Sequence, residues 1–187
     1  MRIVAGQSRG RKLFTPKSND VRPTSDRVRQ ALYNILGSMY DLTVLDLFAG
    51  SGALGLEAIS RGAAQVVFVD SSYNSIQLVK RNVDLLDCAD ICEIWKTKAE
   101  MALKKAYKEN MLFDLILIDP PYKSGEIENI IKRNLLPPIL KEDGRVVLET
   151  AVEYPPELGS VEDKIVDRRK YGSTELIFLD LNIQERL

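Results

Sequence analysis

Apolar runs alternate with amphipathic stretches along most of this 187-residue chain. Five runs have the length and β-branched composition of buried strands: 44–47, 66–69, 91–95, 115–118 and 145–149. Between them, apolar residues recur at the spacing of a helix face in four stretches: 54–59, 76–86, 99–107 and 127–135. This alternation predicts an α/β fold, with a mainly parallel sheet and helices on both of its faces.

The two ends of the chain depart from this alternation. Residues 1–20 predict a short hairpin that turns near residues 7–10, with Leu13 and Phe14 packing on the body of the protein. Residues 164–168 and 176–181 read as two paired strands around a Tyr-Gly turn.

A helix is expected after the N-terminal hairpin. Thr24 or Ser25 can cap its first turn, and Gly37 can end it. Five apolar residues recur at helical spacing between these limits: Val28, Ala31, Leu32, Ile35 and Leu36.

A glycine-rich turn follows the first predicted strand of the alternating region. Gly50, Gly52 and Gly55 have the spacing of the dinucleotide-binding fingerprint, and Asp70 ends the next predicted strand. Glycines permit positive φ and a close approach of the backbone to a ligand, and an acid at this distance can accept from ribose hydroxyls. A nicotinamide-dependent enzyme and a methyltransferase with a nucleoside cofactor both fit these features.

Three observations favour the methyltransferase. Asp46 precedes the glycines, where a carboxylate suits the sulfonium and ammonium groups of S-adenosylmethionine and would repel the phosphates of NAD. The chain has no histidine, and no tyrosine is followed four positions later by lysine, so the usual acid-base partners of hydride transfer are missing. The third observation is a loop with a clear use in amine methylation, described next.

The sequence Asp119-Pro120-Pro121-Tyr122 follows the strand predicted at 115–118. Prolines cannot donate to a sheet ladder and have a fixed φ, so the turn is stiff. In open α/β sheets ligands bind beyond the carboxyl ends of strands, which is where this loop would lie. The acid and the Pro120 carbonyl can accept from an exocyclic amine while the aromatic ring stacks on the base. An ordinary strand-ending turn is the alternative interpretation.

These motifs predict a set of site residues. Asp119, Pro120 and Tyr122 are the expected catalytic residues, and Pro121 is expected to contact the substrate. Seven residues are expected to bind the cofactor: Asp46, Ala49, Gly50, Gly52, Asp70, Ser71 and Ala99.

Several segments together resemble a known family. The glycine turn and the Asp-Pro-Pro-Tyr loop resemble those of class I S-adenosylmethionine-dependent methyltransferases that act on exocyclic amines. Residues 2–13, 22–29, 45–62 and 171–172 are similar to the bacterial 16S ribosomal RNA guanine-N2 methyltransferase family (RsmD-like), and the resemblance covers nearly the whole chain. Lys98 stands where this class often has an acid for the adenine amine, so the adenine contact stays open.

This resemblance implies a Rossmann-like fold with a mainly parallel seven-stranded sheet and a C-terminal antiparallel hairpin. It also implies methylation of the exocyclic N2 of one guanine in 16S rRNA, within a partly assembled or complete small ribosomal subunit. Methylation of adenine N6 in DNA, or of another exocyclic amine, is an alternative. From other classes, a non-catalytic RNA-binding assembly module and an NAD-dependent dehydrogenase are also considered.

Charge is unevenly distributed along the chain. The net charge is −1, yet residues 1–30 carry eight bases against two acids. Such asymmetry indicates a nucleic-acid-binding arm on a more acidic body, although a solvated surface segment is the plainer interpretation. We expect one domain over residues 1–187, with a basic arm at 1–22 and a catalytic body at 23–187. Four bases are expected to bind phosphates: Arg9, Arg11, Lys12 and Arg22.

Composition adds three expectations. Cys88 and Cys92 are the only cysteines and cannot complete a zinc site without histidine, so no metal is expected. Cys92 is expected as a buried strand residue and Cys88 near the end of a helix. The chain shows neither a membrane-spanning run nor a signal peptide, which indicates a cytoplasmic protein without membrane association. We expect a monomer, although no residue pattern determines the oligomeric state.

Overall fold

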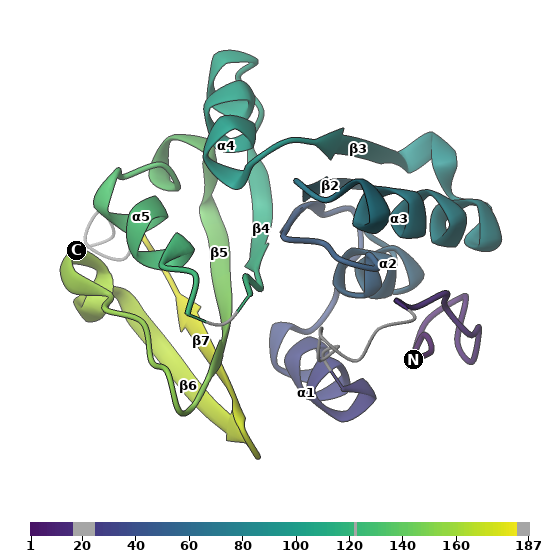
Figure 1. The fold of residues 1–187 in the computed structure, drawn as a ribbon, viewed down its shortest axis with the longest axis horizontal. Helices are drawn as coiled ribbons and strands as arrows, with labels where there is room; N and C mark the ends of the chain where they lie inside the picture. The colour runs from purple at the N-terminus through teal and green to yellow at the C-terminus, as the bar shows by residue number, and fades with distance from the viewer. Residues whose placement is uncertain (17–24, 122, 183–187) are drawn as a thin grey trace. The chain divides into compact units, whose positions relative to one another are not determined.

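The computed structural model describes residues 1–16, 25–121 and 123–182. The chain divides into two compact units, Met1–Ala99 and Glu100–Leu187, each with its own run of strands (Figure 1). The expectation of a single domain composed of an arm and a body stays a prediction.

The first unit contains three parallel strands in the order β3-β2-β1. They are β1 (Thr43–Leu47), β2 (Gln65–Asp70) and β3 (Cys92–Lys96). The inner residues of β1 and β2 are buried, as expected for strands that helices cover on both faces. In this register Asp70, at the carboxyl end of β2, lies beside Lys96 at the end of β3.

Three α-helices accompany these strands: α1 (Asp26–Leu36), α2 (Ala53–Ser60) and α3 (Tyr73–Leu86). The predicted caps of α1 are confirmed, since the Ser25 hydroxyl accepts from the Val28 amide and Gly37 ends the helix at φ 80°. A short 3-10 helix, η1 (Ala89–Ile91), leads into β3.

The second unit contains two parallel strands and an antiparallel hairpin in the order β4-β5-β7-β6. The predicted C-terminal hairpin is therefore confirmed. The elements are α4 (Ala99–Lys108), β4 (Phe113–Ile118), α5 (Glu126–Lys132), η2 (Pro137–Ile139), β5 (Leu140–Ala151), η3 (Gly159–Lys164), β6 (Ile165–Tyr171) and β7 (Thr174–Leu179).

The seven strands and their mainly parallel pairing confirm the predicted fold class. Several element boundaries differ from those predicted, among them the end of β6 at Tyr171 rather than at residue 168. α5 ends at Lys132 rather than at residue 135, because Asn134 adopts a positive φ of 51° that interrupts a helix. β5 begins at Leu140, five residues earlier than predicted, because the polar residues of its first half conceal its strand character.

The cysteine prediction also needs one correction. Cys88 is buried at the start of η1, but Cys92 is only half-buried because it opens β3. Both are free thiols, with their Sγ atoms 3.9 Å apart. Across the described ranges, no helix combines the length and the apolar character needed to cross a bilayer.

The N-terminal hairpin (residues 1–14) forms and lies beside α2 in Figure 1. Residues 17–20 of the predicted segment lie outside the described residues, and Phe14, expected to pack on the body, is 39% exposed. Its two arms pair through an antiparallel bridge between Arg2 and Lys12, and the Gly10 amide donates to the Ile3 carbonyl at 2.9 Å. Ile3 and Leu13 are buried. Gly6 has a φ of 80°, and a Cβ there would lie 1.7 Å from the Ser60 carbonyl oxygen, so only glycine fits against α2.

A buried carboxylate on α2, that of Glu57, organises the packing of this hairpin. One Glu57 oxygen accepts from the Ala5 amide at 2.9 Å, and the other accepts from the Val4 amide at 2.8 Å. The same carboxylate pairs with Arg29 of α1 at 3.4 Å and with Arg61 at 2.8 Å. Since buried charges are tolerated only when they are paired and hydrogen-bonded, this set of contacts holds the hairpin, α1 and α2 together.

Arg29 corrects the charge analysis of the first 30 residues. Its side chain is fully buried, pairs with Glu57 and Asp26, and donates to the Arg2 carbonyl. Arg29 is therefore part of the interior and contributes no exposed positive charge for a nucleic acid. The sequence pattern alone could not reveal this, because buried and exposed bases look alike without their partners.

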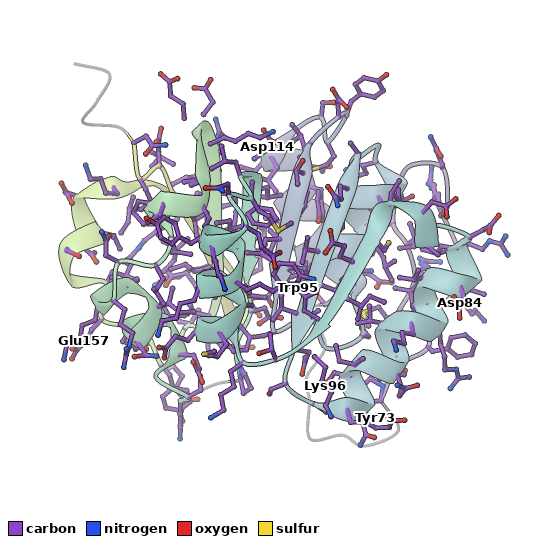
Figure 2. All side chains as sticks on the ribbon, turned by 90° about the horizontal axis from the view of Figure 1, so that it is seen from above. Tyr73, Asp84, Trp95, Lys96, Asp114 and Glu157 are labelled. Carbon is purple, nitrogen blue, oxygen red and sulfur yellow. The ribbon has the colours of Figure 1, made fainter. Side chains whose placement is uncertain are left out.

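We predict that Glu57→Gln lowers the free energy of unfolding by about 3 kcal/mol, because it removes the buried negative charge that pairs with both Arg29 and Arg61. Urea unfolding measures this loss. Asp84→Asn is the control, since it removes an acid from the exposed side of α3 in the same unit (Figure 2), and it should change stability by less than about 0.5 kcal/mol. Equal losses in the two variants would contradict the role of Glu57.

Candidate functional site

The glycine turn between β1 and α2 has three residues with positive φ. Gly50 and Gly52 take φ values of 57° and 79°, and Phe48 takes 62°, which is uncommon for an aromatic residue. Two backbone hydrogen bonds hold this shape: the Ala49 amide donates to the Val69 carbonyl at 3.0 Å, and the Gly52 amide donates to the Ala49 carbonyl at 2.7 Å. Strained backbone of this kind is often found at ligand sites.

Asp70 connects the glycine turn to the turn that follows β2. Its Oδ2 accepts from the Gly50 amide at 2.9 Å, and its Oδ1 accepts from the Ser72 amide at 2.8 Å. Ser71, between them in the chain, is exposed. The structure thus brings together the glycine turn, Asp70 and Ser71, as the sequence predicted.

Asp46 lies beneath the same turn and is almost completely buried. Its Oδ2 accepts from the Gly55 amide at 2.9 Å, inside the first turn of α2. Gly55 itself is needed for packing, because a Cβ at this position would lie 2.4 Å from the Phe68 ring. A direct role of Asp46 toward a cationic ligand stays a prediction.

The turns after β2 and β3 lie side by side at the carboxyl ends of these strands. The Thr97 amide donates to the Asp70 carbonyl at 3.1 Å, and Ala99 then begins α4. Lys96 lies over the ring of Tyr73, with its Nζ 5.4 Å from the ring centroid (Figure 2). Sequence reasoning missed Tyr73, an exposed aromatic residue three positions after Asp70.

This arrangement suits a nucleoside cofactor that carries positive charge. A carboxylate offers about four acceptor positions, and two backbone amides use one position on each Asp70 oxygen. The remaining positions can accept from a pair of ribose hydroxyls. A Cβ on Gly50 would meet only the Phe48 carbonyl oxygen, at 3.9 Å, so the backbone is open to a ligand on that side.

The second unit holds the Asp-Pro-Pro loop. Asp119 follows the last residue of β4 and is half-buried, Pro120 is buried and Pro121 is exposed. The Ser124 amide donates to the Pro121 carbonyl at 3.3 Å, which closes the turn before α5. Tyr122, the predicted stacking residue, lies outside the described residues.

A pocket of about 110 Å³ adjoins this loop within the second unit. Its walls are formed by the Asp-Pro-Pro loop with the start of α5, and by the end of β5 with the segment that follows it. The lining residues are Pro120, Pro121, Lys123, Ser124, Gly125, Glu126, Ile127, Glu128, Glu149, Thr150, Ala151, Tyr154, Pro155 and Pro156.

Four of these lining residues have the chemistry to bind a polar ring, and sequence reasoning missed them all. Glu149 and Thr150 are both buried, and the Thr150 hydroxyl has no hydrogen-bond partner among the residues that the structure describes. Lys123 lies over the Tyr154 ring at 4.0 Å, and a hydrogen bond with Tyr154 raises the pKa of Lys123. The long polar beginning of β5 gave no sign that its far end would line a pocket.

Three predicted phosphate-binding residues lie on the N-terminal hairpin in the first unit. Arg9, Arg11 and Lys12 are exposed, as that prediction requires. Their backbone is ordered by the hairpin, since the Arg9 amide donates to Gly6 at 3.2 Å and the Arg11 amide donates to Ser8 at 3.1 Å. Arg22 lies outside the described residues.

Comparisons with known proteins identify what the whole chain is similar to. The family model described as Conserved hypothetical protein 95 matches residues 1–180. "Putative rRNA methyltransferase YlbH" of Bacillus subtilis (strain 168) is 37% identical over 178 residues, which cover 93% of this chain and 95% of that protein. "Ribosomal RNA small subunit methyltransferase D" of Escherichia coli (strain K12) is 37% identical over 156 residues, covering 82% of this chain and 76% of that protein.

A solved structure shows the same fold. "Putative methyltransferase yhhF from Escherichia coli" matches with a TM-score of 0.80 and 32% sequence identity, and the match covers 95% of this chain and 96% of that one. The seven strands and the C-terminal hairpin therefore form the fold of a known methyltransferase-like structure.

We predict that Asp70→Asn weakens the binding of S-adenosylhomocysteine by about tenfold or more, because an amide cannot accept at both of its atoms and loses the charge-assisted bonds. Isothermal titration calorimetry measures this change. Asp84→Asn removes the same charge from an exposed position on α3 and should bind as tightly as the natural protein. Unchanged affinity in Asp70→Asn would remove Asp70 from the cofactor site.

Proposed function

We infer that this chain, which belongs to the Conserved hypothetical protein 95 family, is an S-adenosylmethionine-dependent methyltransferase of ribosomal RNA that methylates the exocyclic N2 of a guanine in 16S rRNA. Its similarity to the small subunit methyltransferase D of E. coli supports the RNA substrate. Asp70 carries most weight among the structural observations, because its carboxylate joins the glycine turn to the neighbouring strand end, where a nucleoside would bind.

The first unit holds the methyl donor in this proposal. S-adenosylmethionine supplies an electrophilic methyl carbon on a sulfonium. Asp70 accepts from the ribose hydroxyls, the backbone of Gly50 and Gly52 contacts the amino-acid end, and Asp46 provides negative charge beneath the turn. Ala49, Ser71 and Ala99 are the other residues proposed to contact the cofactor. A dehydrogenase does not fit, since the chain is 37% identical to relatives named as methyltransferases and shares the fold of a solved putative methyltransferase.

The Asp-Pro-Pro-Tyr loop holds the methyl acceptor. Asp119 and the Pro120 carbonyl accept from the two amine hydrogens and direct the nitrogen lone pair, while Tyr122 stacks on the base and Pro121 contacts it. The N–C bond would form as the S–C bond breaks, which would leave neutral S-adenosylhomocysteine, and the proton of the cationic nitrogen would then pass to water. No strong base is required, so positioning supplies most of the rate. The target base must leave its stack to reach this loop.

The pocket beside Pro120 supports a guanine rather than an adenine. Guanine carries a ring N–H next to its exocyclic amine, and a carboxylate is the natural acceptor for that donor. Glu149 is a buried carboxylate in the pocket wall. Adenine presents an acceptor at the same ring position, which a carboxylate would repel. Methylation of adenine N6 is therefore the second candidate.

The N-terminal hairpin is the proposed RNA-binding surface. Arg9, Arg11 and Lys12, together with Arg22, would bind phosphates and set affinity without selecting a base. We propose that the substrate is the small ribosomal subunit, partly or fully assembled, and that the protein acts on it as a cytoplasmic monomer.

We predict that Asp119→Ala lowers methyl transfer at least about a hundredfold, because the acceptor amine loses its alignment, while affinity for S-adenosylhomocysteine changes little. Nucleoside mass spectrometry of small-subunit RNA measures the product, and calorimetry measures binding. Asp114→Ala is the matched control, because it removes an acid from β4, the strand just before the loop, and the carboxylate of Asp114 accepts from Lys141 Nζ at 2.8 Å. Detection of N6-methyladenosine in place of N2-methylguanosine would show that the target base is adenine. Full activity of Asp119→Ala would show that the loop does not align the acceptor amine.

We predict that joint replacement of Arg11 and Lys12 by alanine weakens RNA binding and reduces the slope of log affinity against log salt by about 1.5, because two phosphate contacts are lost. Filter binding across a salt titration measures both effects. Joint replacement of Lys105 and Lys108, on α4, removes the same charge elsewhere. If both double variants lose affinity equally, the hairpin has no specific role in RNA binding.

A further inference from the structure

Asn82, on α3, joins the N-terminal hairpin to the glycine turn. Its side chain is fully buried, and within the described part of the chain its amide has three hydrogen bonds, all to backbone groups. The Phe14 amide donates to Asn82 Oδ1 at 2.7 Å, and Asn82 Nδ2 donates to the Phe14 carbonyl at 3.0 Å and to the Ser51 carbonyl at 2.8 Å. One side chain thus forms hydrogen bonds with both backbone polar groups of Phe14 and with the Ser51 carbonyl in the glycine turn.

These bonds leave Asn82 little freedom. A buried polar group that loses its hydrogen-bond partners costs about 1–3 kcal/mol. Moving either the hairpin or the glycine turn would leave part of the Asn82 amide unpaired and would incur this cost. Ser51 lies between Gly50 and Gly52, and the Gly50 amide is held by Asp70. A continuous set of hydrogen bonds and backbone therefore runs from Phe14 through Asn82 and the glycine turn to Asp70, the proposed ribose acceptor.

The opposite end of the hairpin is held independently. The Val4 and Ala5 amides donate to Glu57, and the Ser8 amide donates to the Ser60 hydroxyl at 3.0 Å. These contacts reach α2 but include no residue of the glycine turn. The hairpin also contacts α1, where Arg29 donates to the Arg2 carbonyl. Among these contacts of the described residues, those of Asn82 with Phe14 are the ones that continue to Ser51.

We propose that Asn82 is a positioning residue that couples the docking of Phe14 to the shape of the glycine turn. Cofactor that stabilises the turn then stabilises the attachment of Phe14, and a docked Phe14 favours cofactor binding by the same factor, because such coupling is reciprocal. The RNA-binding hairpin is consequently more ordered when the methyl donor is bound. This inference rests on the assignment of the glycine turn to the cofactor, which belongs to the proposed function.

Arg81 provides a matched control for Asn82. It lies next to Asn82 in α3, and its guanidinium stacks on the Phe14 ring at 4.0 Å. Arg81→Ala therefore removes a contact to the same hairpin residue and leaves the bonds to Ser51 intact. A general loosening of the hairpin affects both variants, whereas loss of the coupling affects only Asn82→Ala.

The experiment measures hydrogen exchange of backbone amides, with and without S-adenosylhomocysteine, in the full-length natural protein and both variants. In the natural protein and in Arg81→Ala, the ligand should slow exchange of the Phe14 amide about fivefold or more. The ligand should not change the exchange rates of the Val4 and Ala5 amides. In Asn82→Ala, the ligand should have no effect on residue 14, and calorimetry should show about five- to tenfold weaker binding.

Two results would overturn the inference. One is equal ligand affinity in Asn82→Ala and Arg81→Ala, and the other is protection of residue 14 by ligand in the absence of the Asn82 amide. If Asn82→Ala is too unstable to measure, ligand-dependent protection of Phe14 in Arg81→Ala alone decides the question. Failure of the natural protein to bind S-adenosylhomocysteine would instead overturn the proposed function, and this inference with it.

Discussion

The first unit depends on one buried carboxylate, that of Glu57. A charge removed from water must be matched by donors, and here four groups from the hairpin, α1 and the end of α2 supply them. Because these donors belong to separate segments of the chain, satisfying the charge fixes where each segment lies. α2 also begins at the glycine turn, so the same contacts hold the helix that supports the candidate cofactor site.

A second acid, Asp70, holds together the turns of the candidate ligand site, as Glu57 holds together the hairpin, α1 and α2. Its carboxylate is used by backbone amides of two turns, and it keeps acceptor capacity for a ligand. Asp46 holds the first turn of α2 from below. Two acids, Asp46 and Asp70, therefore lie at the glycine turn where α2 begins, and their negative charge suits a cationic methyl donor better than a pyrophosphate.

Each unit supports one part of the proposed reaction. The first contains the glycine turn and the basic hairpin, and the second contains the Asp-Pro-Pro loop and its pocket. Asn82 adds a connection inside the first unit, between the hairpin proposed to hold RNA and the turn proposed to hold the cofactor. A single amide can serve this purpose because it is buried, where each unmade hydrogen bond carries its full cost.

Local pattern was sufficient for the alternation of strands and helices, the caps of α1, the glycine turn and the Asp-Pro-Pro loop, because period, turn chemistry and short motifs are written in neighbouring residues. Tertiary structure alone decided that Arg29 is interior, that Asn82 links two distant segments, and that the end of β5 lines a pocket. Those facts depend on interactions between residues far apart in the chain. The sequence does not reveal whether a charged group or an amide forms its hydrogen bonds with water or with a buried partner.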